Sequence, residues 1–252
     1  MNDTELARQI AESAGRLLIG LRQSALFEGK ALGALGDQLA NSFIMRALRT
    51  HRPDDAILSE EERDSAARLT ARRVWIVDPL DGTREYGEAR ADWAVHVALA
   101  IDGVATHGAV ALPGLPLTLS SDEVLTRPRH NGKLRLVVSR TRPAAEAVAV
   151  AEALGAELIP MGSAGAKIMA VVRGEADIYL HSGGQYEWDS CAPVAVAKAA
   201  GLHVSRLDGS ALRYNQANTY MPDLLVCLKE HAERVIELAA SARAAPKSAQ
   251  QP

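Results

Sequence analysis

Two aspartates three residues apart, Asp78 and Asp81, are the residues of this sequence most suited to binding a metal ion. They follow the apolar residues 74–77 and enclose Pro79 and Leu80. Proline fixes its own φ and favours an extended conformation for the residue before it, so both carboxylates can face one cation, together with the Leu80 carbonyl. Hard divalent cations such as Mg²⁺ prefer oxygen ligands of this kind. The same spacing also occurs at ordinary helix starts, and the pair alone leaves both interpretations open.

Further carboxylates lie elsewhere in the chain. Glu60, Glu61 and Glu62 follow the apolar residues 56–58, and Asp189 follows Trp188 at the start of a predicted helix. Three adjacent like charges repel unless they are solvated or neutralised by a cation. By themselves they are equally typical of a solvated surface, and a lone Asp189 is typical of a helix N-cap.

Composition excludes several classes of protein. The 252 residues carry 28 Lys+Arg and 31 Asp+Glu, a net charge of −3, which gives no general attraction to nucleic acid or anionic membranes. The two cysteines, Cys191 and Cys227, cannot make a disulfide framework. The N-terminus resembles no signal peptide, and no apolar run is long enough to cross a membrane. We expect a cytoplasmic protein that uses neither nucleic acid nor membrane as a partner.

Hydrophobic periodicity predicts an α+β first half. Helical spacing covers residues 6–21, a glycine-rich loop is expected at 25–36, and a second helix starts at Asp37. Strands are predicted at 56–58, 74–77, 93–101 and 115–120, and Asp102-Gly103 is a preferred hairpin turn.

Helices and strands alternate in the second half. Strands are predicted at 134–139, 156–160, 176–180 and 202–207, and helices at 143–154, 164–173, 189–200 and from about 229. The turn-rich stretch 126–133 is the best boundary. We therefore predict an N-terminal α+β half with the metal-binding turn (1–126), a C-terminal α/β half with substrate-binding elements (127–240) and a disordered tail (241–252). The fold class is α/β, a layered sandwich.

Three sequence blocks carry a family resemblance. S-E-E at 59–61, D-P-L-D-G-T at 78–83 and W-D-S-C-A-P at 188–193 resemble, in this order, the inositol monophosphatase family of metal-dependent, lithium-sensitive phosphatases. The resemblance extends from about residue 5 to 228. It implies an αβαβα sandwich of the inositol monophosphatase/fructose bisphosphatase type.

Three details resemble the CysQ branch of that family. Residues 81–86 read D-G-T-R-E-Y, Lys167 follows Ser163 by four positions, and L-R-Y-N occupies 212–215. The branch hydrolyses 3′-phosphoadenosine 5′-phosphate (PAP) to AMP and phosphate. The resemblance thus implies this reaction, with the corresponding phosphosulfate as a second substrate and sulfur assimilation as the setting.

The resemblance also implies roles for individual residues. Glu60, Asp78 and the Leu80 carbonyl would hold one Mg²⁺, and Asp78, Asp81 and Asp189 a second. A third, weaker ion would depend on Glu60, and Li⁺ would inhibit. Asp37 and Thr83 would orient and deprotonate the attacking water, although both residue types are also common helix caps.

Substrate contacts are expected from residues near these groups. The resemblance and the anion-binding tendency of helix starts suggest the Ser163 hydroxyl and the N–H groups of 163–166 for phosphate. Arg84 and Lys167 would meet the second phosphate, and Gln185 and Glu187 would contact the ribose. Tyr214 would stack on the base with Arg213 near a phosphate, although both could equally be surface residues of a hairpin. The full set of expected contacts is Gly82, Thr83, Arg84, Ser163, Lys167, Gln185, Glu187, Arg213 and Tyr214.

Several alternatives remain open at this level. Inositol monophosphate and fructose 1,6-bisphosphate are rival substrates, and a non-catalytic regulator that binds phosphorylated ligands is a rival class. Residues 30–38, K-A-L-G-A-L-G-D-Q, lack the proline and threonine usual in relatives. His96 alternates within a strand and is predicted to be a packed core histidine. The sequence does not distinguish a monomer from a homodimer.

Overall fold

The computed structural model describes residues 1–123 and 132–244. The first part contains α1 (Asp3–Gln23), α2 (Gly29–His51), β1 (Ala56–Ser59), a 3₁₀ turn (Ala66–Thr70), β2 (Arg73–Asp81), α3 (Thr83–Gly87), β3 (Ala94–Ile101), β4 (Val104–Leu112) and β5 (Leu117–Ser120). The second part contains β6 (Arg135–Ser139), α4 (Ala145–Leu154), β7 (Glu157–Met161), α5 (Ala164–Val172), β8 (Ile178–Tyr186), α6 (Glu187–Ala199), β9 (His203–Ser205), β10 (Tyr220–Cys227), a 3₁₀ turn (Lys229–His231) and α7 (Ala232–Ala244).

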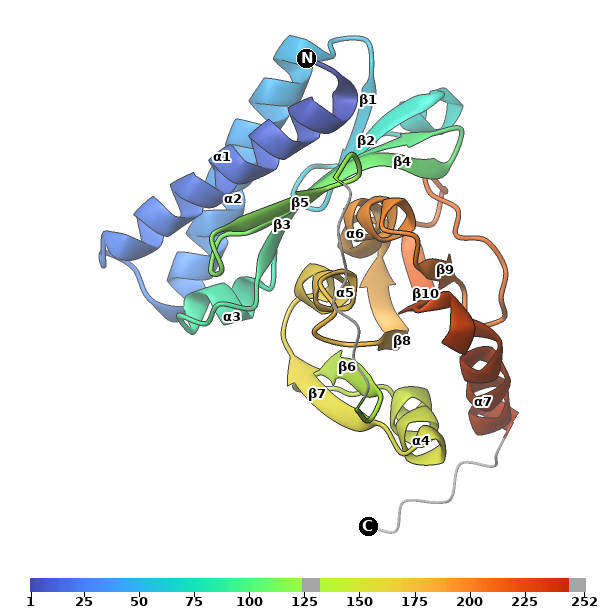
Figure 1. Cartoon of the computed structure of the whole chain (residues 1–252). Helices are drawn as coiled ribbons and strands as arrows, with labels where there is room; N and C mark the ends of the chain where they lie inside the picture. The colour runs from blue at the N-terminus through green and yellow to red at the C-terminus, as the bar shows by residue number, and fades with distance from the viewer. Residues whose placement is uncertain (124–131, 245–252) are drawn as a thin grey trace.

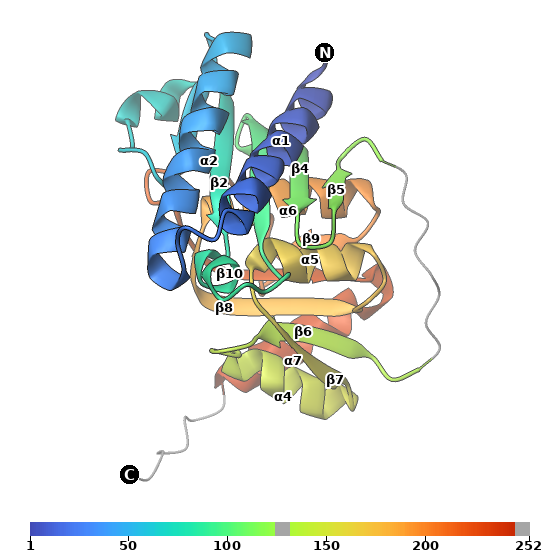
Figure 2. The same cartoon turned by 90° about the vertical axis from the view of Figure 1, so that its left-hand side faces the viewer.

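The elements stack as five alternating layers (Figures 1 and 2). The first sheet has the order β1-β2-β3-β4-β5, with β1 and β2 parallel and the remaining neighbours antiparallel. The second has the order β7-β6-β8-β10-β9. Helices α1 and α2 cover the outer face of the first sheet, α5 and α6 lie between the sheets, and α4 and α7 cover the second sheet. The predicted αβαβα sandwich is confirmed.

Three apolar clusters fill the spaces between the layers. The predicted stripe of α1, including Leu6, Ile10 and Leu18, packs with α2 against the first sheet. The largest cluster fills the space between the sheets, where Ile168 and Val194 of the two middle helices meet both sheets. Every residue of α5 is therefore buried, which explains its almost entirely apolar sequence, whereas α6 is buried over residues 190–197 and exposed at Lys198. Among the helices of the described residues, none has the length and apolar content that a membrane crossing needs.

Three sequence predictions about the fold are wrong. Residues 29–36 belong to α2 rather than to a loop, so Asp37 lies well inside a helix. Three glycines suggested a loop, but Gly33 and Gly36 allow α2 to approach Thr83 and Leu80 closely. Strand β10 was missed, although it joins β8 to β9 in the second sheet. The predicted tail begins too early, since α7 continues to Ala244.

The predicted division at 126/127 lies outside the described residues, and so does the tail at 245–252. Along the sequence, all strands of the first sheet precede residues 124–131 and all strands of the second sheet follow them. The division into an N-terminal and a C-terminal half stays a prediction.

The Asp223 carboxylate links β10 to α7, and we expect removal of this carboxylate to destabilise the protein. Its carboxylate accepts hydrogen bonds from Arg206 (2.7 Å), Leu207 N (2.9 Å) and Arg243 (2.9 Å). Although burial opposes ionisation, these donors lower the pKa of Asp223 to about 2. Because the folded pKa lies below the unfolded value of about 3.9, this stability exists above pH 4 and disappears as the pH falls towards 2.

The corresponding variant is Asp223→Asn, compared with the wild type by urea unfolding. It should lose about 2 kcal/mol of unfolding free energy at pH 7 and about half as much at pH 3. An equal loss at both pH values would contradict an electrostatic role for this carboxylate.

Candidate metal centre

The turn after β2 brings Asp78 and Asp81 to one edge of the first sheet. The pairing of β2 with β3 shifts register between these two residues, so neither is displaced to the opposite face by the intervening dipeptide. Leu80 N donates to Oδ1 of Asp78 (3.0 Å). Gly82 then adopts a left-handed conformation with φ of 90°, which ends the strand and starts α3. The predicted Asp-x-x-Asp turn is present, with both carboxylates buried.

Asp81 is bound by the N-terminus of α5. Its carboxylate accepts hydrogen bonds from Ser163 Oγ (2.5 Å), Gly165 N (2.6 Å) and Ala164 N (3.2 Å). These are the groups that the sequence suggested for a substrate phosphate. In this structure the group bound at the helix start is the acidic side chain of Asp81. Any phosphate contact of Ser163 stays a prediction.

His96 completes a group of three candidate metal ligands. Its side chain is fully buried, as predicted for a core histidine, and its Nδ1 lies 3.1 Å from the carbonyl oxygen of Trp188. Its Nε2 has no hydrogen-bond partner and lies 3.3 Å from Oδ2 of Asp81. Ligand atoms of Asp78, Asp81 and His96 all lie within 4.8 Å of one another. The proximity of His96 to Asp78 and Asp81 was not predicted from the sequence, although the pairing of β2 with β3 places His96 opposite Asp78.

The carboxylates around this centre repel one another. Burial, reinforced by Glu60, Asp81 and Asp189, raises the pKa of Asp78 well above its usual value. Burial also raises the pKa of Asp189 to about 8, with Asp81 as the next cause. For Glu60 burial raises the pKa to about 7, although part of this side chain is exposed. Buried acidic groups that resist ionisation so strongly fit a site built for a cation, because a divalent ion would stabilise their charged forms.

Asp37 and Thr83 meet beside this centre. Thr83 Oγ1 lies 3.2 Å from Oδ2 of Asp37 and 3.1 Å from the Leu80 carbonyl oxygen. Burial, with Glu61 and Glu60, raises the pKa of Asp37 to about 7. Neither residue is an N-cap, because Glu28 precedes α2 and Gly82 precedes α3. The expected pair is therefore assembled, from α2 and α3.

Gly165 is required by the close packing of α5 on His96, and we expect Gly165→Ala to destabilise the protein. A methyl group there would overlap Nε2 of His96, which is fixed by the Trp188 carbonyl. Overpacking a site of this kind costs about 1–3 kcal/mol, measurable by urea unfolding. Gly20→Ala in α1 tests the alternative of a general glycine effect, because nothing lies within 4 Å of a methyl group there and Gly20 has no positive φ. Equal losses in the two variants would show that contact with His96 is unimportant.

Lys167 is buried, contrary to the usual exposure of helical lysines. Its Nζ donates to the carbonyl oxygens of Gly162 and Ser163, both at 2.7 Å. Burial lowers the pKa of this amine to about 8. Lys167 therefore stabilises the loop that binds Asp81. The predicted contact of Lys167 with a phosphate receives no support.

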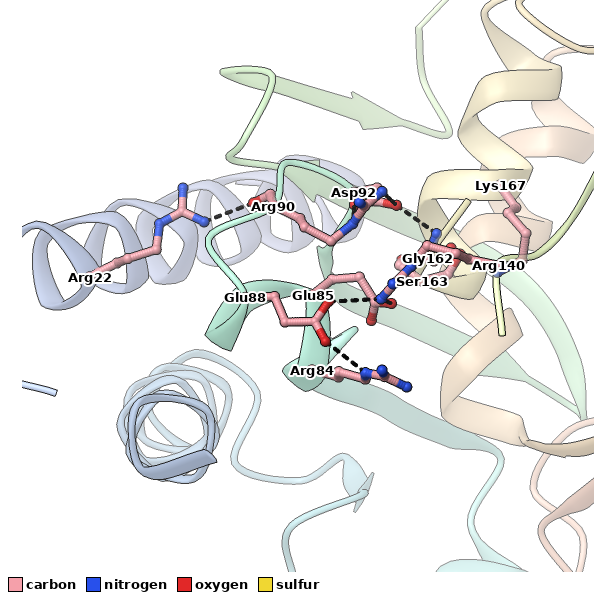
Figure 3. A network of polar contacts seen from close by, with 10 residues as sticks. All are labelled: Arg22, Arg84, Glu85, Glu88, Arg90, Asp92, Arg140, Gly162, Ser163 and Lys167. Atoms are coloured by element: carbon pink, nitrogen blue, oxygen red, sulfur yellow. Dashed lines mark hydrogen bonds and ion pairs between the residues drawn. The ribbon is translucent and has the colours of Figure 1, made fainter. Parts of the chain in front are cut away.

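A polar network joins α3 to that same loop (Figure 3). Arg140, after β6, donates to Glu85 and Glu88 of the α3 segment, both at 2.9 Å. Asp92 accepts from Gly162 N (2.6 Å) and pairs with Arg90. The network links the turn at residues 78–82, at the end of β2, to the second sheet. Its side chains were not among the predicted site residues.

Three other expected substrate contacts are occupied within the protein. The exposed guanidinium of Arg84 pairs with Glu88 (2.8 Å). Gln185 is buried and donates to the Tyr179 hydroxyl (2.9 Å). Buried Glu187 accepts from Asn215 N (2.6 Å) and Gln216 N (2.7 Å), so a ribose contact from it is not supported.

The predicted stacking role of Tyr214 is wrong in this structure. Its ring is fully buried in the core between the sheets, and its hydroxyl lies 3.2 Å from Ser190 Oγ. Its backbone N–H donates to Gly103 O, at the end of the β3–β4 hairpin remote from Asp78. Residues 211–214 form neither helix nor strand, and within this segment Tyr214 is buried while Arg213 is exposed.

Comparison with known proteins agrees with this geometry. Residues 29–157 and 131–244 match the Inositol monophosphatase family. The chain belongs to the inositol monophosphatase family. Within it, the protein named 3′-phosphoadenosine 5′-phosphate phosphatase from Mycobacterium leprae is 49% identical over 242 residues, which cover 90% of this chain and 89% of that protein.

More distant members of the inositol monophosphatase family are similar as well. The 3′(2′),5′-bisphosphate nucleotidase CysQ of Escherichia coli K12 is 31% identical over 197 residues, covering 73% of this chain and 80% of its own. The crystal structure of CysQ from Bacteroides thetaiotaomicron superposes with a TM-score of 0.79 at 25% identity, covering 90% of this chain and 97% of that one. An inositol monophosphatase from Thermotoga maritima, at 20% identity and a TM-score of 0.78, shares the fold.

Proposed function

We propose that this chain is a metal-dependent phosphatase that removes the 3′-phosphate of PAP, giving AMP and phosphate. The observation that carries the proposal is the buried group of acidic residues around Asp78, beside the Asp37–Thr83 pair. The 49% identity to a protein named for this reaction supports the substrate. A regulator without catalysis would not need Asp37 and Thr83 held together beside the carboxylates.

The cation is Mg²⁺ in this proposal, with Li⁺ as an inhibitor. Glu60, Asp78, the Leu80 carbonyl, Asp81 and Asp189 hold two or three ions. When bound, Mg²⁺ lowers the pKa of water and neutralises charge on the phosphate. We also assign the reaction, and the parallel reaction on the phosphosulfate, to sulfur assimilation in the cytoplasm.

Asp37 and Thr83 act as a proton relay. The single hydroxyl proton of Thr83 has two acceptors nearby, the Asp37 carboxylate and the Leu80 carbonyl. If the Leu80 carbonyl served as a cation ligand, the Thr83 proton would point to Asp37, and the Thr83 oxygen would be free to accept a hydrogen bond from water. During attack, Thr83 takes the proton of the water and passes its own to Asp37. The pKa of about 7 suits Asp37 to this exchange near neutral pH.

Removal of the Thr83 hydroxyl should therefore slow the chemical step. We expect Thr83→Val to lower kcat by about 10²–10⁴-fold at saturating Mg²⁺, with little change in KM. Thr83→Ser keeps the hydroxyl and should retain most of the rate. A steady-state comparison of the two variants on PAP decides this, because equal loss in both would point to packing of the threonine methyl group instead.

Substrate choice tests the proposed function. Phosphate release with Mg²⁺ should be measured for PAP and inositol 1-phosphate, with and without Li⁺. A kcat/KM at least about a hundredfold higher for PAP corresponds to roughly 2.7 kcal/mol of transition-state discrimination. Comparable values would instead identify a broad phosphatase and refute the assignment to PAP.

A further inference from the structure

Three aromatic side chains form a partly exposed cluster at the start of α6, here called the aromatic platform. The rings of Tyr186 and Trp188 stack with centroids 4.9 Å apart and planes 10° from parallel. Tyr220 meets Tyr186 edge-on at 5.8 Å. Tyr186 is 42% exposed and Tyr220 is 40% exposed, whereas the other three tyrosines are fully buried. The platform is therefore the place where this chain presents tyrosine rings to solvent.

The platform is attached to the metal centre through its backbone. Tyr186 N donates to Oδ2 of Asp189 (2.7 Å), and the Trp188 carbonyl oxygen lies 3.1 Å from His96 Nδ1. The Tyr220 hydroxyl accepts from Gly184 N (3.1 Å), which fixes the third ring beside the first two. The backbone that carries two of these rings is thus in direct contact with Asp189 and His96 of the candidate metal centre.

We propose that the aromatic platform binds the base of the nucleotide substrate. This inference rests on the proposed function. In a nucleoside 3′-phosphate the base and the phosphate are carried by the same ribose ring, so a phosphate at the metal centre has its base close beside it. Exposed aromatic rings stack on nucleobases of any sequence because each base has a flat π-face. The platform takes the role that the sequence suggested for Tyr214.

Such stacking gives a simple basis for substrate choice. Inositol phosphates and sugar phosphates have no flat aromatic group to place on Tyr186 or Tyr220. The platform therefore favours nucleotides over these substrates, and it does so without discriminating among bases. Because the rings would bind the base equally in the ground state and in the transition state, we expect this specificity to appear in KM.

The test compares PAP with ribose 3,5-bisphosphate, which has both phosphates but no base. For Tyr186→Ala we expect KM for PAP to rise at least about fivefold, with kcat nearly unchanged, and KM for ribose 3,5-bisphosphate to stay within about twofold. Tyr186→Phe, which keeps the ring, should recover most of the loss. Leu158→Ala removes an apolar group of similar exposure on β7 and should change neither substrate. Equal increases in KM for both substrates, or no increase, would overturn the proposal.

Binding of AMP gives a second readout that does not need turnover. Trp75 and Trp93 are fully buried, so quenching of tryptophan fluorescence by AMP should come from Trp188 and vanish in Trp188→Phe. Failure of the wild type to hydrolyse PAP would refute the proposed function, while this titration would still decide the platform. If equilibrium dialysis shows that AMP saturates the protein and the tryptophan fluorescence is still not quenched, the proposed role of the platform is overturned.

Discussion

Replacing Asp78 by asparagine is expected to lower kcat/KM for PAP by at least about a hundredfold. Asp78 is almost entirely buried, and four nearby acidic residues repel the charged form of its carboxyl group: Glu60, Asp81, Asp189 and Asp37. Asparagine preserves the size of the side chain but removes the negative charge at the centre of the site. The apparent Mg²⁺ affinity should fall together with the rate, which a Mg²⁺ titration of activity would measure.

Asp102→Asn is the matched control for this variant. Asp102 follows β3, near the end of the β2–β3 pair remote from Asp78, where it is exposed and pairs with Arg72. Its φ of 52° is also well tolerated by asparagine. Loss of activity in Asp102→Asn but not in Asp78→Asn would contradict the assignment. The same would hold if Asp81→Asn kept full turnover, because Asp81 belongs to the proposed second metal set.

The second large expected effect is that Mg²⁺ stabilises the protein more at pH 8 than at pH 6.5. Burial raises the pKa of Asp37 to about 7 and that of Asp189 to about 8, whereas an unfolded aspartate titrates near 3.9. The folded protein therefore holds protons that the unfolded chain has lost. Without a cation, the stability from these protonated groups is complete below about pH 4 and decreases as the pH rises through 7 and 8.

The pKa values of Asp37 and Asp189 also determine the size of this effect and the pH range in which it occurs. Asp37 and Asp189 together should reduce the free energy of unfolding by about 2 kcal/mol between pH 6.5 and 8. His181 acts in the opposite direction, because burial lowers its pKa to about 4, but its contribution lies below pH 6.5. Above pH 6.5 the acidic groups dominate, and bound Mg²⁺ should remove their cost.

Thermal unfolding in EDTA and in excess Mg²⁺, at several pH values from 6.5 to 8, measures this effect. The midpoint in EDTA should fall with pH, and the increase produced by Mg²⁺ should grow. Asp78→Asn should show a flatter dependence in EDTA, since one of the repelling charges is gone. A midpoint in EDTA that stays constant or rises over this range would disprove the electrostatic account.

Local patterns in the sequence predict the layers of the fold because most elements have clear periodicity. The helix over 29–36 was missed because glycine lowers helix propensity, while its close packing against Thr83 depends on tertiary contacts. Strand β10 was missed because Met221-Pro222-Asp223 interrupts its apolar run. Its irregular pairing with β8 at Met221/Asp223 accommodates the proline.

In the candidate metal centre, the positions of side chains that depend on one turn follow from the sequence more readily than those that depend on packing. Asp78, Asp81, Asp37 and Thr83 come together as the resemblance implies. The Asp81 contacts with 163–165, and the burial of Tyr214, depend on how the two sheets face each other. No spacing along the chain contains that information, so side chains near the substrate site were the least predictable.

The contacts of Asp81 also have a consequence for how the molecule folds. They join residues 82 to 84 positions apart, and the expected ligand Asp189 lies further still along the chain. Contacts between such distant segments close large loops and form late in folding. The complete site exists only after the two sheets have docked through α5 and α6. A cation that requires the complete site acts on the lifetime of the native state, because it retards unfolding and leaves the earlier folding steps unchanged.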